Sequence, residues 1–380
     1  MDVGAAMTFG VFSLADGRRR IGVRAGEEVL DAAAALPRFA DLLSAPVLNP
    51  LLAAGPDTWA AVREAAHDAL DRAEHRVALA DATLHLPIEV ADYVDFFSNE
   101  HHARNAGEIF RPGQDPLPTN WKHIPIGYHG RAGSIVVSGT PIVRPCGMRR
   151  SSAGPVYGPS RRLDIEAELG FVVGVGSPLG SRVPVTEFAE RVFGVFLLND
   201  WSARDLQAFE TVPLGPFLGK SFATSVSPWV VPLADLSAAR VDPPARDPEP
   251  ADYLSDAEPW GLDITMEVRL NGHVISRPPV RENYWTGAQQ LAHMTVNGAP
   301  SRTGDVYGSG TVSGPEREQR GCLLELSWGG KEPITLPDGS TRTFLEDGDE
   351  VVISATAPGP DGSVVDLGAV AGTVLPARTG

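Results

Sequence analysis

Hydrophobic and polar positions alternate along much of the chain after about residue 86, a pattern typical of half-buried β-strands. Asn271-Gly272 lies between two such runs, and this dipeptide favours the two-residue turn of a β-hairpin. Helical patterns are expected only over Glu187–Val192 and roughly Tyr284–Met294. The larger part of the chain is therefore predicted to be a β-sandwich or rolled sheet. The clearest alternating runs are Asp164–Val175, Leu262–Leu270, Cys322–Trp328 and Glu350–Thr356.

The first 85 or so residues form a separate pattern. Two strand-like runs, Met7–Leu14 and Ile21–Val23, flank a turn at Ala15-Asp16-Gly17. From about residue 86, Gly and Pro become dense and the character of the chain changes. We therefore predict a small N-terminal unit over residues 1–86 and a larger unit over residues 87–380.

A helix is predicted near the end of the N-terminal unit. Asp57 could cap this helix, and His67 and His75, on or beside it, are expected to be exposed. The apolar residues that recur at helical spacing are Trp59, Val62, Ala66 and Leu70.

Composition and charge exclude several classes of function. A hydrophobic fraction of 43% is enough for a buried core, while a formal net charge of −16 argues against general affinity for nucleic acid or an anionic membrane. No apolar run approaches the roughly 18 residues of a membrane span, and the N-terminus does not resemble a secretory signal. Cys146 and Cys322 are too few for a disulfide framework. A cytoplasmic location is expected.

A Pro-rich stretch, Asp242–Pro259, interrupts the alternating runs. Such composition favours a surface insertion or a lid, with a linker as the alternative.

Acidic residues in apolar surroundings are the first candidates for chemistry. In a strand through Asp164–Leu169, Glu166 and Glu168 point to one face and repel each other unless they face water or share a cation. This pair alone is more typical of a solvated strand. Asp95 and Asp200, however, lie in apolar runs where an unpaired carboxylate would be costly. Four acids without a Cys or paired-His pattern favour an all-oxygen site for Mg²⁺ or Ca²⁺.

Candidate bases lie between residues 101 and 129, which hold four of the nine histidines. Glu325 is the one acid in the apolar run Cys322–Trp328, which is expected to be a strand. A histidine oriented by a buried carboxylate is a good general base, but the pattern does not choose between His101 and His102. Lys220 follows a rigid Gly/Pro-shaped approach and suits a ligand-facing role or a structural ion pair equally.

Taken in order along the chain, these segments resemble the fumarylacetoacetase family. The resemblance extends from about residue 90 to the C-terminus and is weaker before that. It implies an SH3-like N-terminal β-barrel over residues 1–86, a mixed β-sandwich roll over residues 87–380, and a homodimer. The segments that carry it are Asp92–Phe96, His102, Gly127–Arg131, Val136–Pro141, Asp164–Glu168, Asn199–Asp205, Pro213–Phe222, Ser309–Gly314 and Leu324–Trp328.

The resemblance also implies a reaction and the residues that perform it. The reaction is metal-dependent hydrolysis of a C–C bond in a dicarboxylate β-diketone, fumarylacetoacetate to fumarate and acetoacetate, which ends tyrosine and homogentisate breakdown. His102 would be the general base, oriented by Glu325. The residues implied around the metal are Asp95, Glu166, Glu168 and Asp200, with Lys220 and Thr224. Those implied to stabilise charge or to contact the substrate are Arg204, Lys220, Arg111, Tyr128, Gln207 and Thr311.

Two positions depart from the family pattern, because Phe97 and Thr211 stand where tyrosines are common. Both are expected to line the substrate pocket. A relative acting on a different β-diketone or on an acylpyruvate therefore stays open. So do a keto-acid decarboxylase, an isomerase and, in another class, a non-catalytic Ca²⁺-stabilised dimer module, which would have no need for His102 and Glu325 beside the metal.

Overall fold

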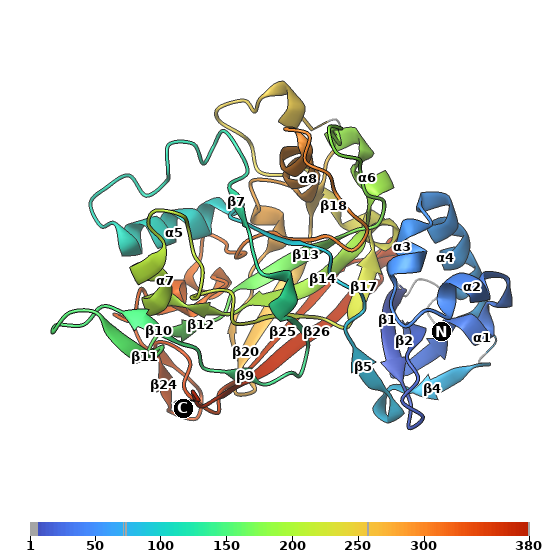
Figure 1. The fold of residues 1–380 in the computed structure, drawn as a ribbon, viewed down its shortest axis with the longest axis horizontal. Helices are drawn as coiled ribbons and strands as arrows, with labels where there is room; N and C mark the ends of the chain where they lie inside the picture. Colours follow the sequence, from blue (N-terminus) through green and yellow to red (C-terminus); the bar gives the residue numbers. More distant parts are fainter. Residues whose placement is uncertain (1–6, 71, 73, 257, 379–380) are drawn as a thin grey trace.

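The computed structural model describes residues 7–70, 72, 74–256 and 258–378, and their fold is mostly β (Figure 1). A 13-stranded sheet and a five-stranded sheet form the framework, which confirms the predicted fold class. Among the described residues, no helix is long and apolar enough to cross a membrane.

The N-terminal strands belong to the large sheet. β1 and β2 pair antiparallel around the predicted turn, where Gly17 adopts a φ of 68°. β1 also pairs with β17 (Trp229–Pro232), so the N-terminal strands continue into the strands of the larger part. Within the described residues β4 and β5 do not pair with each other, so the implied barrel closure is not seen. The bounds are β1 (Thr8–Ser13), β2 (Arg20–Ala25), β3 (Glu28–Asp31), β4 (Arg76–Ala78) and β5 (Thr83–His85).

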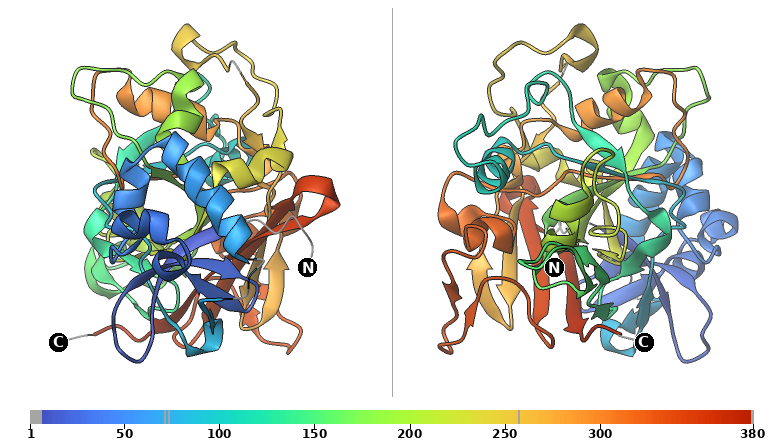
Figure 2. Two further views of the ribbon diagram at one scale, coloured as in Figure 1. Left: turned by 90° about the vertical axis from the view of Figure 1, so that its right-hand side faces the viewer. Right: turned by 60° about the vertical axis from the view of Figure 1, so that its left-hand side comes forward.

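Helices cover the N-terminal strands, and Figure 2 shows them in blue. The predicted helix is α4, in which Val62 and Ala66 are fully buried. Asp57 lies inside its first turn rather than before it, so the predicted position of the cap is wrong. His67 and His75 are exposed, as predicted. The helices are α1 (Ala32–Ala35), α2 (Ala40–Leu43), α3 (Asn49–Ala53) and α4 (Pro56–Leu70).

The rest of the large sheet holds both parallel and antiparallel pairs. Its order from β17 is β17-β14-β13-β22-β6-β7, and β16 pairs with β14 and with β8. The strands are β14 (Val192–Asp200), β13 (Ala167–Val173), β22 (Val306–Gly308), β6 (Tyr93–Phe96), β7 (Gly127–His129), β16 (Thr224–Val226) and β8 (Ile135–Val137).

The five-stranded sheet has the order β21-β20-β25-β26-β9. The predicted hairpin joins β20 to β21, with Asn271 and Gly272 at φ values of 52° and 80°. Such positive φ values are those of a two-residue hairpin turn. The strands are β20 (Thr265–Leu270), β21 (His273–Ser276), β25 (Glu350–Pro358), β26 (Val364–Leu375) and β9 (Ile142–Val143).

The two sheets bury their facing side chains in one hydrophobic core. Leu169 and Phe171 of β13 and Leu197 of β14 share this core with Ile353 and Leu367 of the smaller sheet. Because side chains alternate along a strand, the even-numbered residues of β13 and β14 point to the opposite face of the large sheet. That face carries the acids described below.

Several helices of the larger part differ from the prediction. The expected helices correspond to α6 (Phe188–Arg191) and α8 (Gly287–Thr295), but α5 (Glu100–Phe110) and α7 (Arg204–Glu210) were not predicted. The strand predicted over Cys322–Trp328 is wrong, because α9 (Leu323–Leu326) is a turn of helix. The run Asp164–Val175 is interrupted after Asp164, which belongs to β12 (Leu163–Asp164). Small two-stranded sheets pair β12 with β15 (Ser202–Ala203), β10 (Cys146–Arg149) with β11 (Val156–Pro159), β18 (Arg240–Val241) with β19 (Gly261–Leu262), and β23 (Ile334–Thr335) with β24 (Thr341–Arg342).

The Pro-rich stretch is a packed insertion between β18 and β19, which pair with each other (gold at the top of both views in Figure 2). Leu254 is fully buried in a cluster with Trp121 and Trp285. Arg246 donates hydrogen bonds to the backbone oxygen of Tyr284 and to the side chain of Gln289. These contacts tie the insertion to the region around α8.

Candidate active site

Acidic side chains from neighbouring strands converge on the face of the large sheet that points away from the core shared with the five-stranded sheet. Glu168 extends from β13, Asp200 from the end of β14 and Asp95 from β6. One carboxylate oxygen of each lies within 4.8 Å of those of the other two. Thr224 lies opposite Asp200 in the register of β16, and its hydroxyl donates to Asp200 Oδ1 over 3.0 Å. We call Asp95, Glu168 and Asp200 the acidic cluster.

Two acids of the acidic cluster, Asp95 and Glu168, each have a buried oxygen to which no described residue donates a hydrogen bond. Burial, and the charges of the neighbouring acids, raise the pKa of Glu168 well above its usual range. Burial likewise raises the pKa of Asp95, although Lys220 acts in the opposite direction. Asp95 Oδ1 and Glu168 Oε1 are buried and have no hydrogen-bond partner among the described residues. An all-oxygen set with unused lone pairs fits a hard divalent cation.

Gly308, on β22, leaves room for the Glu168 carboxylate. A Cβ on Gly308 would lie 2.6 Å from Glu168 Oε2 and 3.3 Å from the hydroxyl of Tyr93. A larger residue would therefore displace the carboxylate. The Tyr93 hydroxyl is buried and is also without a partner among the residues described.

Glu166 has a different environment from the other three predicted ligands. Its carboxylate accepts hydrogen bonds from Lys220 Nζ and, over 2.7 Å, from Arg204 Nη1. Although burial alone would raise it, these two cations hold the pKa of Glu166 well below its usual range. Lys220 Nζ also lies 2.5 Å from Asp200 Oδ2. In this structure Glu166 therefore anchors the cations at the edge of the acidic cluster.

A histidine and a glutamate form a second buried group. The Nδ1 atom of His102, on α5, lies 2.6 Å from Glu325 Oε2 on α9. The Glu325 carboxylate also accepts from Asn105 Nδ2 (2.8 Å), Ser313 Oγ (2.9 Å) and Cys322 Sγ (3.0 Å). Although burial acts in the opposite direction, His102 and these donors lower the pKa of Glu325 to about 2. We call His102 and Glu325 the dyad.

The dyad fixes the tautomer of the imidazole. Because Nδ1 faces an ionised carboxylate, it carries the proton and leaves Nε2 free to accept another. His101 instead contacts Glu282 at 3.3 Å, and both side chains are one-third exposed. Of the two adjacent histidines, His102 is the one that a buried glutamate orients, which is the geometry expected of a general base.

A cavity of about 160 Å³ borders the acidic cluster. Its position gives a small ligand access to the face of the sheet that carries Asp200. Its lining includes Tyr93, Tyr128, Arg131, Asp200, Lys220 and Thr224.

Comparisons with known proteins agree along nearly the whole chain. The family model described as Fumarylacetoacetate (FAA) hydrolase C-terminal matches residues 93–375, and the model described as Fumarylacetoacetase N-terminal matches residues 6–87. The chain belongs to the fumarylacetoacetase family. Fumarylacetoacetase of Homo sapiens is 44% identical over 98% of this chain and 95% of its own length. That of Arabidopsis thaliana is 41% identical, with 97% and 94% covered.

Solved structures share the fold at low sequence identity. Fumarylacetoacetate hydrolase from Exiguobacterium antarcticum has a TM-score of 0.57 and 20% identity, with 98% of this chain and 100% of that chain covered. Maleylpyruvate hydrolase from Sphingobium sp. SYK-6, in complex with manganese(II) ion and pyruvate, has a TM-score of 0.56 and 16% identity, with 98% and 100% covered.

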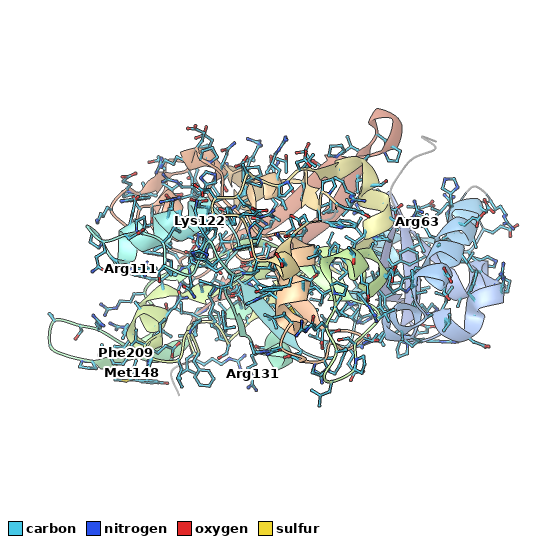
Figure 3. All side chains as sticks on the ribbon, turned by 90° about the horizontal axis from the view of Figure 1, so that it is seen from above. Arg63, Arg111, Lys122, Arg131, Met148 and Phe209 are labelled. Atoms are coloured by element: carbon cyan, nitrogen blue, oxygen red, sulfur yellow. The ribbon has the colours of Figure 1, made fainter. Side chains whose placement is uncertain are left out.

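The structure gathers most of the residues that the fumarylacetoacetase resemblance implied. Arg204 is buried and contacts Gln207 Oε1 at 3.3 Å, while its Nη2 has no partner in the described part of the chain. Thr311 Oγ1 is buried and unpartnered in the same sense. Tyr128, on β7, lies opposite Asp95. Arg111 is not gathered: it is exposed, its side chain donates to the backbone oxygen of Pro116, and it lies toward the edge of the molecule (Figure 3).

The two positions that depart from the fumarylacetoacetase pattern do not line the 160 Å³ cavity. The ring of Phe97 packs edge-on against the imidazole of His102, with 5.3 Å between ring centres. The Thr211 hydroxyl donates to the backbone oxygen of Gln207 over 2.6 Å. Phe97 therefore packs against the dyad, and Thr211 is hydrogen-bonded to the last turn of α7. That both line the substrate pocket stays a prediction.

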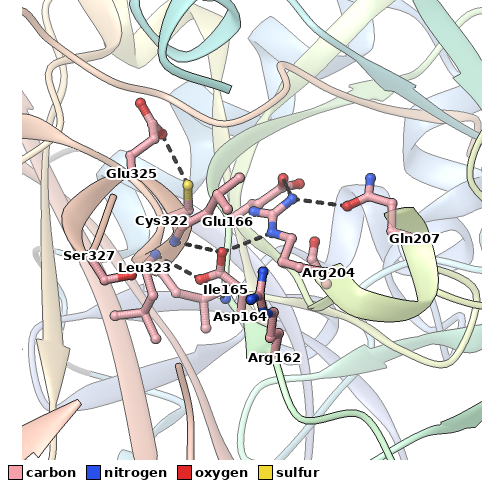
Figure 4. Close-up of polar contacts among 12 residues, drawn as sticks. Arg162, Asp164, Ile165, Glu166, Arg204, Gln207, Cys322, Leu323, Glu325 and Ser327 are labelled. Carbon is pink, nitrogen blue, oxygen red and sulfur yellow. Dashed lines mark hydrogen bonds and ion pairs between the residues drawn. The ribbon is translucent and has the colours of Figure 1, made fainter. Parts of the chain in front are cut away.

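Residues that the sequence analysis missed form hydrogen bonds with Glu325 and Arg204. Asn105 and Ser313 complete the hydrogen bonds of Glu325. Asp164, fully buried, contacts both Arg204 and the start of α9 (Figure 4). An acid next to apolar residues was a signal for Asp164, which precedes Ile165, just as it was for Asp95, which lies within an apolar run.

Proposed function

We propose that this chain is a hydrolase that cleaves fumarylacetoacetate with water to give fumarate and acetoacetate, in tyrosine breakdown. The observation that carries the proposal is the 2.6 Å contact between His102 Nδ1 and Glu325 Oε2 in a protein that also holds a buried acidic cluster. A non-catalytic module has no use for a histidine whose free nitrogen is oriented in this way. The 44% identity to human fumarylacetoacetase supports the choice of substrate.

The acidic cluster is proposed to hold Mg²⁺ or Ca²⁺. Asp95, Glu168 and Asp200 would be ligands, with Glu166 as the fourth acid and with Lys220 and Thr224 around the site. A divalent ion there would supply a Lewis acid for the two carbonyl oxygens of a β-diketone. Oxygen donors favour these ions over zinc.

The protein's own groups would perform the proton transfer. His102 Nε2 takes a proton from water while the water oxygen forms a bond to the carbonyl carbon. The C–C bond then breaks, its electron pair goes to the leaving carbon as an enolate, and a proton returned to that carbon completes the hydrolysis. Glu325 keeps the imidazole in position and stabilises its positive charge. Ionised Glu325 therefore supports the base throughout the cycle.

Cationic and polar side chains would stabilise the developing charge. Arg204 Nη2 is a buried donor with no partner among the described residues, which suits it to an oxyanion. Lys220 and Gln207 would assist it. Arg111, Tyr128 and Thr311 are proposed to contact the substrate, with Arg111 requiring a movement of its loop. The two-domain division at residue 86 and the cytoplasmic location also stay proposals.

A homodimer is part of the proposal. Large apolar side chains are exposed on the loop after α7, where Leu214 is 94% exposed, and on the nearby β10–β11 hairpin, where Tyr157 is 70% exposed. Figure 3 shows Met148 of that hairpin beside Phe209 of α7. A second copy would cover this surface. Leu214→Glu is expected to shift the mass measured by light scattering from dimer to monomer, whereas Leu179→Glu, at a site that is 81% exposed, leaves it unchanged.

The decisive experiment is a turnover assay of the purified protein with added Mg²⁺ or Ca²⁺. Fumarylacetoacetate is followed by loss of its ultraviolet absorbance, beside maleylacetoacetate and simple acylpyruvates. Turnover of fumarylacetoacetate at the highest kcat/KM supports the proposal. A clear preference for an acylpyruvate would assign the chain to a different reaction of the same kind, and turnover of none of them would refute it.

A further inference from the structure

Asp164 is a fully buried carboxylate outside the acidic cluster and the dyad, and it accepts four hydrogen bonds. Its Oδ1 accepts from the backbone nitrogens of Leu323 (2.7 Å) and Ile165 (2.8 Å). Its Oδ2 accepts from Leu324 N and Arg204 Nε, both at 2.9 Å. Figure 4 shows Asp164 between Arg204 and the segment that leads to Glu325. One side chain therefore contacts two parts of the proposed machinery.

The first contact orients the guanidinium of Arg204. Asp164 holds Nε, and Glu166 holds Nη1 at 2.7 Å on another edge of the same planar group. A guanidinium fixed at two of its nitrogens cannot rotate, so the direction of the third is set. That third nitrogen, Nη2, is the buried donor without a partner among the described residues.

The second contact orients the start of α9. The cap residue of this turn, Cys322, makes no capping hydrogen bond with its side chain. Asp164 takes over that role, because it accepts from the first two backbone nitrogens of the turn. Glu325 is the next residue along the turn, and its carboxylate holds His102. A displacement of the turn would thus move the dyad.

We propose that Asp164 is a positioning residue that fixes Arg204 and the dyad relative to each other through one carboxylate. The inference rests on the proposed function, in which the imidazole activates the water and the guanidinium stabilises the negative charge that the attack of that water creates. A purely structural role is a weaker account, since a buried charge is costly and an apolar residue would fill the space with less penalty. The hydrogen bonds of Asp164 to Arg204 and to the start of α9 lead instead to two groups, the guanidinium and the dyad, that must act together.

The test replaces Asp164 by asparagine, which has the same shape but cannot accept four hydrogen bonds. Loss of a supporting hydrogen bond of this kind typically costs about 10- to 100-fold in activity. We expect kcat to fall by that factor while KM stays within about twofold. In ¹⁵N-histidine spectra, the signal of the His102 Nδ1 proton should move, because its distance to Glu325 changes.

The matched control is Asp349→Asn. Asp349 is also buried, at 3% exposure, and its carboxylate accepts from Arg342, Asn271 and the backbone nitrogen of Glu346. Asp349 contacts neither Arg204 nor α9. We expect Asp349→Asn to lower the melting temperature and to leave kcat and the His102 signal unchanged.

The outcomes separate the inference from the proposed function. If Asp164→Asn behaves like Asp349→Asn in both kcat and spectrum, the inference is overturned. If the wild type fails to turn over fumarylacetoacetate, the proposed function fails, while an unchanged His102 signal in Asp164→Asn would still overturn the positioning role on its own. Should Asp164→Asn not fold, Asp164→Glu keeps the charge and shifts both sets of hydrogen bonds, and an undiminished kcat in that variant would refute the inference.

Discussion

The acidic cluster and the dyad use the same kind of residue in opposite ways. Glu325 is fully buried and accepts hydrogen bonds from His102, Asn105, Ser313 and Cys322. Glu168 is also fully buried, yet one of its oxygens has no partner among the described residues. Hydrogen-bond donors of the protein surround the first carboxylate, whereas the second has an oxygen for which the described residues provide none. A buried carboxylate oxygen that lacks a donor is therefore a stronger indication of a ligand site than burial alone.

The largest expected effect comes from removing an acid of the cluster. Asp200→Ala is expected to abolish divalent metal binding and activity, because it removes one of the three converging carboxylates and a partner of Lys220. Isothermal titration calorimetry with Mg²⁺ and Ca²⁺ measures the binding, and circular dichroism checks that the variant is folded. Undiminished affinity in a folded variant would remove Asp200 from the site.

Of the two adjacent histidines, only His102 should be important for activity. His102→Ala is expected to lower kcat by about 10² to 10⁴, the usual contribution of a general base. His101→Ala, which removes a partly exposed contact with Glu282, should change kcat far less. Steady-state kinetics on the two variants measures the difference. Similar losses in both would remove His102 from its proposed role.

The comparison is tested most directly by the same substitution in each group. Glu325→Gln is expected to destabilise the protein by about 2 to 4 kcal/mol, because it breaks a buried, hydrogen-bonded charge. Glu168→Gln should leave metal-free stability unchanged or raise it slightly, since it removes a repelled charge and keeps an acceptor for Gly310 N. Urea unfolding without metal measures both. A loss of equal size in Glu168→Gln would contradict the contrast drawn here.

The destabilisation by Glu325→Gln should also depend on pH. The pKa of Glu325 is lowered from 4.5 to about 2 in the folded protein. Its contribution to stability is therefore complete above about pH 4.5 and is lost as the pH falls through 2. Urea unfolding of wild type and variant between pH 7 and pH 3 should show the difference in free energy of unfolding shrinking below pH 4.5. A difference that grows on acidification would have the wrong sign.

The smallest effect concerns the two departures from the family pattern. Phe97→Tyr places a hydroxyl near His102, and Thr211→Tyr frees a position now bonded to Gln207. Together they are expected to raise kcat/KM on fumarylacetoacetate by about tenfold for each 1.4 kcal/mol of hydrogen bonding regained. The variants are compared with wild type on fumarylacetoacetate and on a bulkier β-diketone. If kcat/KM does not rise, Phe97 and Thr211 are neutral replacements of the family's tyrosines.

Much of the framework could be predicted from alternation alone. The hairpin at Asn271-Gly272 and the strand at Glu350–Thr356 follow from local backbone chemistry, which needs no distant partner. The segment around Glu325 could not be assigned, because a short apolar run suits a strand and a helix equally. Its helical turn depends on the carboxylate of Asp164, which is remote in sequence. A local pattern of apolar and polar residues cannot show a hydrogen bond between segments that are remote in sequence.

The candidate site shows the same division. Asp95 and Asp200 were predicted because an acid in an apolar run needs a partner, and both lie in the acidic cluster. Glu166 and Glu168 looked equivalent in sequence, yet Lys220 and Arg204 form hydrogen bonds with Glu166 and not with Glu168. Strand alternation says which face a side chain points to and does not say which cation reaches it. The helix α5, which carries His102, was missed because the side chains on its buried face are small or polar: His102, Ala103, Ala106 and Gly107.

The hydrogen bonds between β1 and β17 have a consequence for how the chain is made and shortened. β1 leaves the ribosome long before β17 is synthesised, so the backbone groups of β1 that pair with β17 form their hydrogen bonds late. A chain cut to begin at residue 87 would leave β17 with an open strand edge of buried, apolar residues, Trp229 to Val231. Such an edge is a template for pairing with other chains. Truncated forms should therefore aggregate during expression, even though every proposed site residue is still present.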